Sequence, residues 1–157
     1  SLGKSPYAFG AHVAVVEVSR KTGAIKILKY VGVHDSGTIV NPMLAEGQVH
    51  GAVVQGIGQA LFEGMVYDPD GQPLSGSLMD YALPRADNMP SFTFETMETP
   101  SPITGLGVKG IGELPTLAAP AAIANAVMDA LSQTGVRHID TPLTTEKVWR
   151  ALHGSNP

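Results

Sequence analysis

The sequence predicts an α+β fold in which an N-terminal β-hairpin and a mixed sheet pack against helices. Three observations support this prediction. Two runs rich in β-branched residues flank a short turn near the start of the chain, a long glycine-containing helical segment follows them, and an alanine-rich segment lies near the end. β-branched runs favour strands, whereas long apolar segments rich in alanine favour helices.

The strands are predicted from short runs bounded by turn residues. Residues 11–19 (AHVAVVEVS) form the first, and residues 24–33 (AIKILKYVGV) form its hairpin partner across the turn at 20–23. The alternating run SFTFETME at 91–98 predicts a third strand. The segment HID at 138–140 predicts a further, short one.

The first helix is predicted over about residues 43–63. Asn41 can cap its free amides, and Pro42 suits the first helical position. Each exposed glycine in a helix costs about 1 kcal/mol relative to alanine. We therefore expect some of the four glycines in this helix to serve close backbone packing. They are Gly47, Gly51, Gly56 and Gly58.

Two more helices and two loops complete the chain. Residues 117–132 predict a helix that tolerates Pro120 near its first turn, and residues 144–152 predict a last helix capped by a threonine. The tetrapeptide DPDG at 68–71 predicts a turn. Residues 99–116 form a long loop rich in glycine and proline, a feature that usually carries function or is disordered.

The composition excludes several classes of function. The chain has 157 residues, 43% of them hydrophobic and 15% charged, which predicts a globular protein of one domain or of two small ones sharing a core. From the order of its elements we expect a single domain over 1–157, with a strand and helix portion at 7–98 and a loop and helix portion at 99–153. A net charge of −4 argues against nucleic-acid binding. The absence of cysteine excludes disulfides and thiolate sites, and the five histidines lack zinc-ligand spacing, so we predict no protein-ligated metal. No membrane span and no signal peptide are apparent, and we expect a cytoplasmic protein.

One carboxylate lies within a glycine-rich loop, in the stretch GVKGIGELPT at 107–116. Glycines let the backbone approach a ligand closely, so Glu113 is a candidate general base. The structural alternative is a glutamate at the start of the next helix, stabilised by the helix dipole. The sequence leaves both interpretations open.

Two other stretches have some features of ligand sites. Residues 105–110 match the G-x-G-x-x-G dinucleotide pattern, but prolines surround the match and the required strand–turn–helix context is missing, so we predict no Rossmann site. Residues 35–38 (DSGT) gather side-chain oxygens and free amides between a strand and a helix start. They could contact a ligand, or simply form an Asx turn and a helix cap.

Several long motifs resemble one family in their order. These are DSGTIVNPMLAEGQVHGAVVQGIGQALFE, SLMDYALPRADNMPSF, ETPSPITGLGVKGIGELPTLAAPAAIANAVMDAL and VRHIDTPLTTEKVW. From about Tyr7 to His153 the chain resembles the C-terminal part of the molybdenum-binding large subunit of the xanthine oxidase family of molybdenum hydroxylases. This family includes aldehyde oxidoreductases and bacterial carbon monoxide dehydrogenase.

The resemblance implies a site and a cofactor. It implies that the fold is part of a molybdenum-binding domain and that the metal is held by a molybdopterin cofactor, in the cytosine dinucleotide form, without protein ligands. The glutamate of the K-G-x-G-E motif, here Glu113, would act as the catalytic base beside the metal. The residues expected to contact the cofactor are Asp35, Ser36, Thr38, Asn41, Lys109, Gly110, Ile111 and Gly112.

The resemblance also implies partners. A large subunit of this family is several times longer than 157 residues, so the remainder of the large subunit, an iron–sulfur subunit and a subunit carrying FAD are expected in an oligomer that acts on a small-molecule substrate. The isolated chain would be inactive. The alternatives are a non-catalytic assembly domain that retains the fold, and a nucleotide-binding module using residues 105–110. The intact Glu113 argues against the assembly domain.

Overall fold

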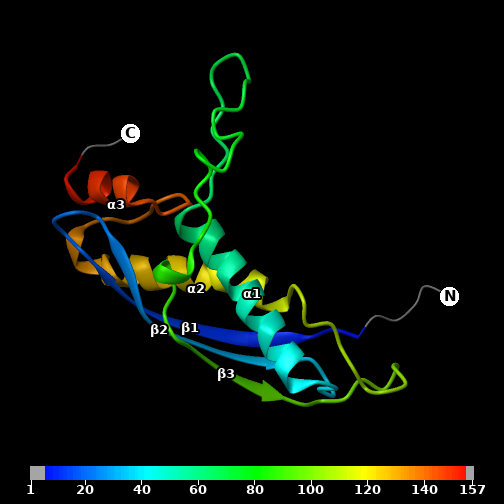
Figure 1. Cartoon of the computed structure of the whole chain (residues 1–157). Coiled ribbons are helices and arrows are strands. Elements are labelled where there is room, and N and C mark those ends of the chain that lie inside the picture. Colours follow the sequence, from blue (N-terminus) through cyan, green and yellow to red (C-terminus); the bar gives the residue numbers. More distant parts are fainter. Residues whose placement is uncertain (1–5, 155–157) are drawn as a thin grey trace.

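The chain folds into a three-stranded sheet with helices on one face (Figure 1). The computed structural model describes residues 6–154. Strands β1 (Phe9–Val18) and β2 (Ile25–Asp35) pair antiparallel, and β3 (Phe92–Met97) pairs parallel with β2, which gives the order β1-β2-β3. A parallel pair requires a crossover connection, and here the chain between β2 and β3 includes the first helix. The predicted hairpin, mixed sheet and α+β class are confirmed.

The helices begin at the predicted capping residues or close to them. The Asn41 side chain accepts a hydrogen bond from the Leu44 amide at 3.1 Å, and the Thr144 hydroxyl accepts one from the Lys147 amide at 3.3 Å. Both predicted caps are therefore confirmed. The helices are α1 (Pro42–Leu61), α2 (Leu114–Ala130) and α3 (Thr145–Leu152), with short 3₁₀ turns η1 (Ala86–Asn88) and η2 (Ser132–Thr134).

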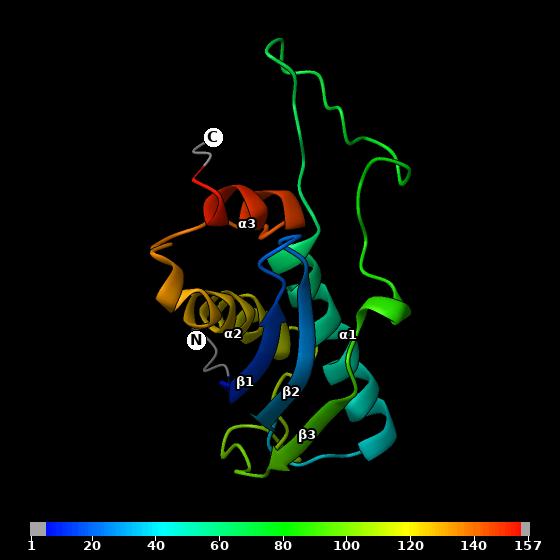
Figure 2. The same ribbon diagram turned by 90° about the vertical axis from the view of Figure 1, so that its left-hand side faces the viewer.

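The hydrophobic core lies between the sheet and the two long helices. Helix α2 contacts both α1 and β1, and Figure 2 shows the two helices on the same side of the sheet. The core side chains that are entirely shielded from solvent include Tyr30, Val53, Ile57, Ile123 and Val127. The two long helices and the sheet thus form one packed unit.

Two of the four glycines of α1 serve close packing, as expected. A Cβ atom added to Gly56 would lie 2.6 Å from the Cβ of Ala119 on α2, and one added to Gly58 would lie 3.0 Å from the Cγ of Pro84. Gly47 and Gly51 differ, because an added Cβ would meet nothing within 4 Å at either position. The crossing of α1 and α2 therefore depends on Gly56, whereas the other two glycines lie on an exposed face.

Two predictions about the C-terminal third were wrong. Residues 138–140 have no regular secondary structure, because no strand in residues 6–154 pairs with them, and a strand needs such a partner. Helix α2 begins at Leu114, three residues before the predicted start, because Pro115 is accommodated in the first turn, where a missing amide hydrogen costs nothing. The earlier start places Glu113 at the N-cap position.

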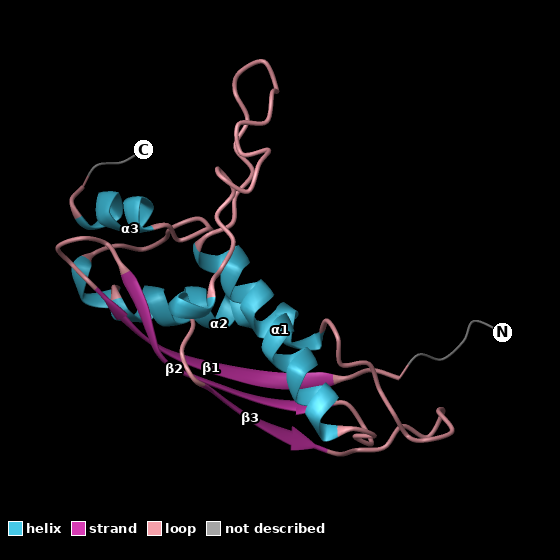
Figure 3. Ribbon diagram, in the orientation of Figure 1, coloured by secondary structure: helices cyan, strands magenta, loops and turns pink. Residues whose placement is uncertain are grey.

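The segment between α1 and β3 forms an extended arm, here defined as residues 63–85. Figures 1 and 3 show it as a long loop that projects away from the sheet and helices. The predicted turn at its tip is confirmed, since the Gly71 amide donates to the Asp68 carbonyl at 3.0 Å. Its base is closed by a hydrogen bond from the Tyr81 hydroxyl to the Glu63 carboxylate at 2.7 Å. No helix among the described residues is long and apolar enough to cross a membrane.

Candidate functional site

The turn that follows β2 and the glycine-rich loop before α2 meet, although about 70 residues separate them in the chain. The Lys109 amide donates to the Ser36 carbonyl at 2.8 Å, and the Thr38 amide donates to the Gly107 carbonyl at 3.2 Å. Gly37 has a φ of 66° and lies so close to Gly107 that an added Cβ would overlap its carbonyl oxygen. Only glycine fits this crossing without strain.

A buried ion pair fastens the two segments together. The Lys109 ammonium lies 3.1 Å from Asp35 Oδ1, and the side chains are 9% and 0% exposed, respectively. The same carboxylate accepts hydrogen bonds from the Gly37 amide at 2.8 Å, from the Thr99 amide at 3.1 Å and from the Thr99 hydroxyl. The Asx turn that the sequence offered as an alternative is therefore present at Asp35.

These contacts keep Asp35 ionised. Burial alone would raise the pKa of its carboxyl group, but the hydrogen bonds from Thr99, Gly37 and Lys109, together with the positive charge of Lys109, lower the pKa from 3.8 to about 2. Asp35 and Lys109 consequently neutralise each other within the protein. The ammonium of Lys109 also lies 5.1 Å from the centre of the Phe9 ring, which adds a cation–π contact.

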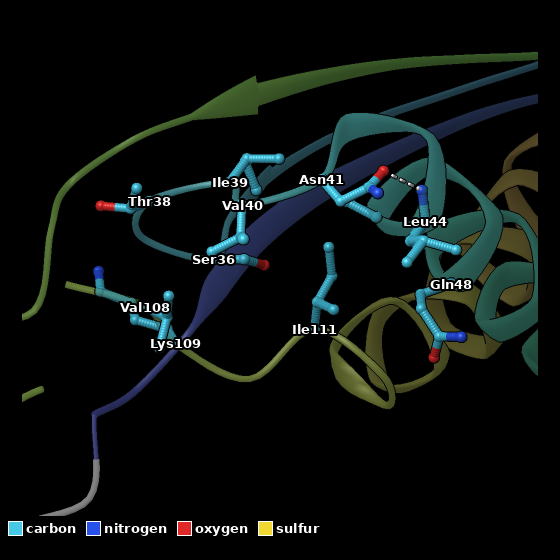
Figure 4. Close-up of a pocket in the computed structure, with 11 residues that line it drawn as sticks. Ser36, Thr38, Ile39, Val40, Asn41, Leu44, Gln48, Val108, Lys109 and Ile111 are labelled. Atoms are coloured by element: carbon cyan, nitrogen blue, oxygen red, sulfur yellow. Dashed lines mark hydrogen bonds between the residues drawn. The ribbon is translucent and has the colours of Figure 1, made fainter. Parts of the chain in front are cut away.

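A shallow cavity of about 220 Å³ opens beside this junction (Figure 4). The Ser36 hydroxyl is buried there and has no hydrogen-bond partner within the described residues. A buried hydroxyl without a partner is costly, so a polar ligand group at this position would satisfy it. The cavity is lined by Ser36, Thr38, Ile39, Val40, Asn41, Leu44, Ala45, Gln48, Val108, Lys109 and Ile111.

The structure gathers most of the sequence-predicted contact residues around this cavity. Five of the eight line it, namely Ser36, Thr38, Asn41, Lys109 and Ile111. The other three, Asp35, Gly110 and Gly112, do not line it. Asp35 lies behind the cavity in the ion pair, whereas Gly110 and Gly112 are exposed on the loop that leads to α2.

Glu113 is exposed and occupies the N-cap position of α2, two residues beyond the cavity-lining Ile111. Its side chain makes no capping hydrogen bond to the helix. The position expected by the structural alternative, a glutamate at the start of the next helix, is therefore present in the structure. The carboxylate remains available to a group outside the chain.

Sequence reasoning missed the contribution of α1 to the cavity. Leu44, Ala45 and Gln48 follow Asn41 at intervals of three, four and seven residues, which places all four on one helix face. This spacing was readable in the sequence once Asn41 was identified as the cap. Gln48 also lies near the loop, since a Cβ added to Gly112 would be 3.5 Å from its Oε1.

Comparison with known proteins identifies the family of the chain. Residues 2–90 match the molybdopterin cofactor-binding domain family. The chain is 46% identical over 148 residues to the nicotine 6-hydroxylase large subunit of Paenarthrobacter nicotinovorans, covering 94% of this chain and 18% of that protein. It is 38% identical over 150 residues to the carbon monoxide dehydrogenase large chain of Hydrogenophaga pseudoflava, covering 96% and 19%.

Solved structures show the same fold. A crystal structure of Cu,Mo-CO dehydrogenase matches with a TM-score of 0.90 and 33% identity, over 94% of this chain and 19% of that one. Quinoline 2-oxidoreductase from Pseudomonas putida 86 matches with a TM-score of 0.87 and 40% identity, over 90% and 18%. The chain thus spans about a fifth of the length of these relatives. It belongs to the molybdopterin-binding large subunits of the molybdenum hydroxylase family.

Proposed function

We propose that this chain forms the part of a molybdenum hydroxylase large subunit that holds one side of the molybdopterin cofactor and presents the catalytic glutamate. The observation that carries the proposal is the junction of the two segments, which brings the unpartnered Ser36 hydroxyl and the loop bearing Glu113 to one region. Neither segment could form the site alone, because each supplies the hydrogen-bond partners of the other.

The residues divide into those that contact the cofactor and those that position them. Ser36 would donate its buried hydroxyl to a polar group of the cofactor, with Thr38 and Asn41 beside it on the cavity wall. Asp35 would act indirectly, because its carboxylate is already saturated by contacts within the protein. Lys109 would line the cavity with its side-chain stem, since its charge is neutralised by Asp35.

Glu113 would serve as the general base during substrate oxidation. Gly110 has open space beside it and Gly112 meets only the end of the Gln48 side chain, so the loop can lie against a flat ligand while the carboxylate projects from the start of α2. The bound cofactor would supply the two-electron redox chemistry that amino acid side chains lack. The task of the glutamate is to accept the proton that is released when the substrate is oxidised.

The names of the relatives support a larger assembly. They are called large subunits or chains, and one is called a subunit of a 6-hydroxypseudooxynicotine dehydrogenase complex. We infer that the chain works with the remainder of a large subunit and with iron–sulfur and FAD subunits, in a cytoplasmic oligomer that uses the cytosine dinucleotide form of the cofactor. The substrate would be an aldehyde, an N-heterocycle or carbon monoxide.

The test is the substitution Glu113→Gln in the assembled enzyme. Glutamine keeps the size of the side chain but cannot accept the proton, and the next acidic residues along the chain are Glu98 and Asp129. Single-turnover reduction of the molybdenum centre by a substrate of the wild-type enzyme should slow by about a hundredfold to ten-thousandfold. Metal and pterin contents should stay normal.

The matched control is Glu98→Gln, which removes an exposed acid at the other end of the same loop and should leave the rate unchanged. A wild-type rate in Glu113→Gln with normal cofactor would refute the catalytic role. A wild-type protein that forms the assembly without molybdenum or pterin would instead favour the non-catalytic assembly domain.

A further inference from the structure

Two histidines and a tyrosine form a hydrogen-bonded chain on the inner face of the sheet. His12 Nδ1 lies 2.6 Å from the Tyr30 hydroxyl, and His12 Nε2 lies 2.6 Å from His34 Nε2. Tyr30 and His34 are buried, at 0% and 1% exposure, and the three rings are arranged edge to face. His34 comes directly before the Asp35 and Ser36 of the cavity junction.

The strand register is arranged to bring these rings together. In the β1–β2 pairing, His12 lies opposite Gly32 and His34 lies opposite Gly10. A Cβ added to Gly32 would be 2.9 Å from His34 Cε1, and one added to Gly10 would be 3.1 Å from His34 Cδ2. The His34 imidazole therefore lies between Gly32 of its own strand and Gly10 of the other strand, and the space beside its ring exists because both positions lack a side chain.

The cluster favours uncharged imidazoles. Burial, followed by repulsion from His34, lowers the pKa of His12 to about 4, and burial also lowers the pKa of His34. No carboxylate of the described residues lies within ion-pair distance of either ring. At a separation of 2.6 Å the two Nε2 atoms can hold one proton between them, since two N–H groups cannot face each other.

The surrounding elements offer few charges that could offset an added proton. From α1 the nearest titratable group is His50, which packs on Phe92 and Phe94 of β3 and pairs with Glu46 at 3.8 Å. At the end of β2 the Asp35 carboxylate is already paired with Lys109. Helix α2 carries no acidic or basic residue between its start and Asp129.

We propose that His12, Tyr30 and His34 are positioning residues for the cavity: their hydrogen-bonded chain anchors the end of β2, and with it the Ser36 hydroxyl, as long as the two imidazoles are uncharged. The link to cofactor binding rests on the proposed function, but the anchoring itself does not. Acidification would release the turn, because opening exposes the histidines to water, where each binds a proton with a pKa near 6.5.

Hydrogen–deuterium exchange of the intact protein that contains this chain tests the proposal without reference to activity. Peptides covering residues 36–44 and 101–113 report on the Thr38 and Lys109 amides that join the two segments. After correction for intrinsic exchange, their protection should fall on acidification from pH 6.5 to 5, by up to about tenfold per pH unit for each histidine released. Peptides from α3 should keep their protection.

Three variants separate the effect of the hydrogen-bonded chain from general effects on stability. Tyr30→Phe removes one hydrogen bond and should lower protection of the junction at pH 7 by about threefold to tenfold. His12→Gln keeps a donor and an acceptor but cannot titrate, so it should make the pH dependence shallower and leave only the contribution of His34. The control His50→Gln removes a neighbouring histidine that is not part of the hydrogen-bonded chain. It should change neither the protection of the junction at pH 7 nor the pH dependence of that protection.

Three results would overturn the proposal. The first is no pH dependence in the wild type, and the second is a pH dependence in His12→Gln as steep as in the wild type. The third is a loss of protection in α3 together with the junction, because the cluster would then support the whole fold rather than position this turn. A junction that behaves as predicted in a protein that lacks the cofactor would uphold the anchoring and refute only the proposed function.

Discussion

The glycines of α1 allow a direct comparison between packing and helix propensity. Replacing Gly47 or Gly51 by alanine places a methyl group where nothing lies within 4 Å. The only large effect is the better helix propensity of alanine, which should raise the free energy of unfolding by about 1 kcal/mol per site. Both positions lie inside α1, away from its ends.

The same substitution at Gly56 meets the opposite helix. The added methyl carbon would lie 2.6 Å from the Cβ of Ala119, 3.0 Å from the Cδ of Pro120 and 3.0 Å from the Thr116 carbonyl oxygen. Two of these neighbours belong to short or ring side chains and one to the backbone, so none can rotate away. Overpacking of this kind costs about 1–3 kcal/mol.

The gain in propensity is common to all three sites and cancels in the comparison. Gly56→Ala should therefore be less stable than Gly47→Ala or Gly51→Ala by about 1–3 kcal/mol, which is the overpacking cost alone. Urea unfolding followed by circular dichroism at 222 nm measures this difference, since a gap of 2 kcal/mol corresponds to roughly 1 M in the midpoint. Equal stabilities for the three variants would refute the close crossing of α1 and α2.

Three further predictions concern the junction and the surface. Ser36→Ala should leave folding intact but lower the pterin content of the assembled enzyme, measured by fluorescence after oxidation, because the cavity loses its unpartnered hydroxyl. Lys109→Met should destabilise the chain by about 3–5 kcal/mol, since it leaves Asp35 buried without its partner. In the wild type the stability contributed by Asp35 is lost only as pH falls from 3.8 towards about 2. Lys109→Met should therefore unfold at a higher pH than the wild type during acid titration, which fluorescence can follow. The isolated chain should self-associate in analytical ultracentrifugation, because Leu78 and Met79 on the arm are 78% and 96% exposed, and a strictly monomeric chain at high concentration would contradict this.

Local patterns in the sequence were sufficient for most of the elements. The Asn41 and Thr144 caps and the turn at 68–71 depend on interactions within a few residues, and the β-branched runs express a local preference for strand; all are found in the structure. The prediction of a strand at 138–140 was wrong because strand formation depends on a partner elsewhere in the chain. A strand forms only beside a pairing partner, and the three residues themselves carry no information about whether a partner is available.

The resemblance to a known family selected the residues of the candidate site, but it did not describe their arrangement. Asp35 and Lys109 were both expected to touch the cofactor, and the structure shows that they also pair with each other, with Lys109 on the cavity wall and Asp35 outside it. Gln48 was not expected, although its spacing from Asn41 placed it on the same helix face.

The sequence by itself determined the fold class, the helix caps and the presence of a single carboxylate in a glycine-rich loop. Only the tertiary structure decided that the turn after β2 meets that loop, that Gly56 rather than Gly47 or Gly51 lies at the helix crossing, and that His12 faces His34 across the hairpin. The physical reason is that each of these contacts joins segments far apart in the chain. Their geometry depends on strand register and helix packing, which no local pattern encodes.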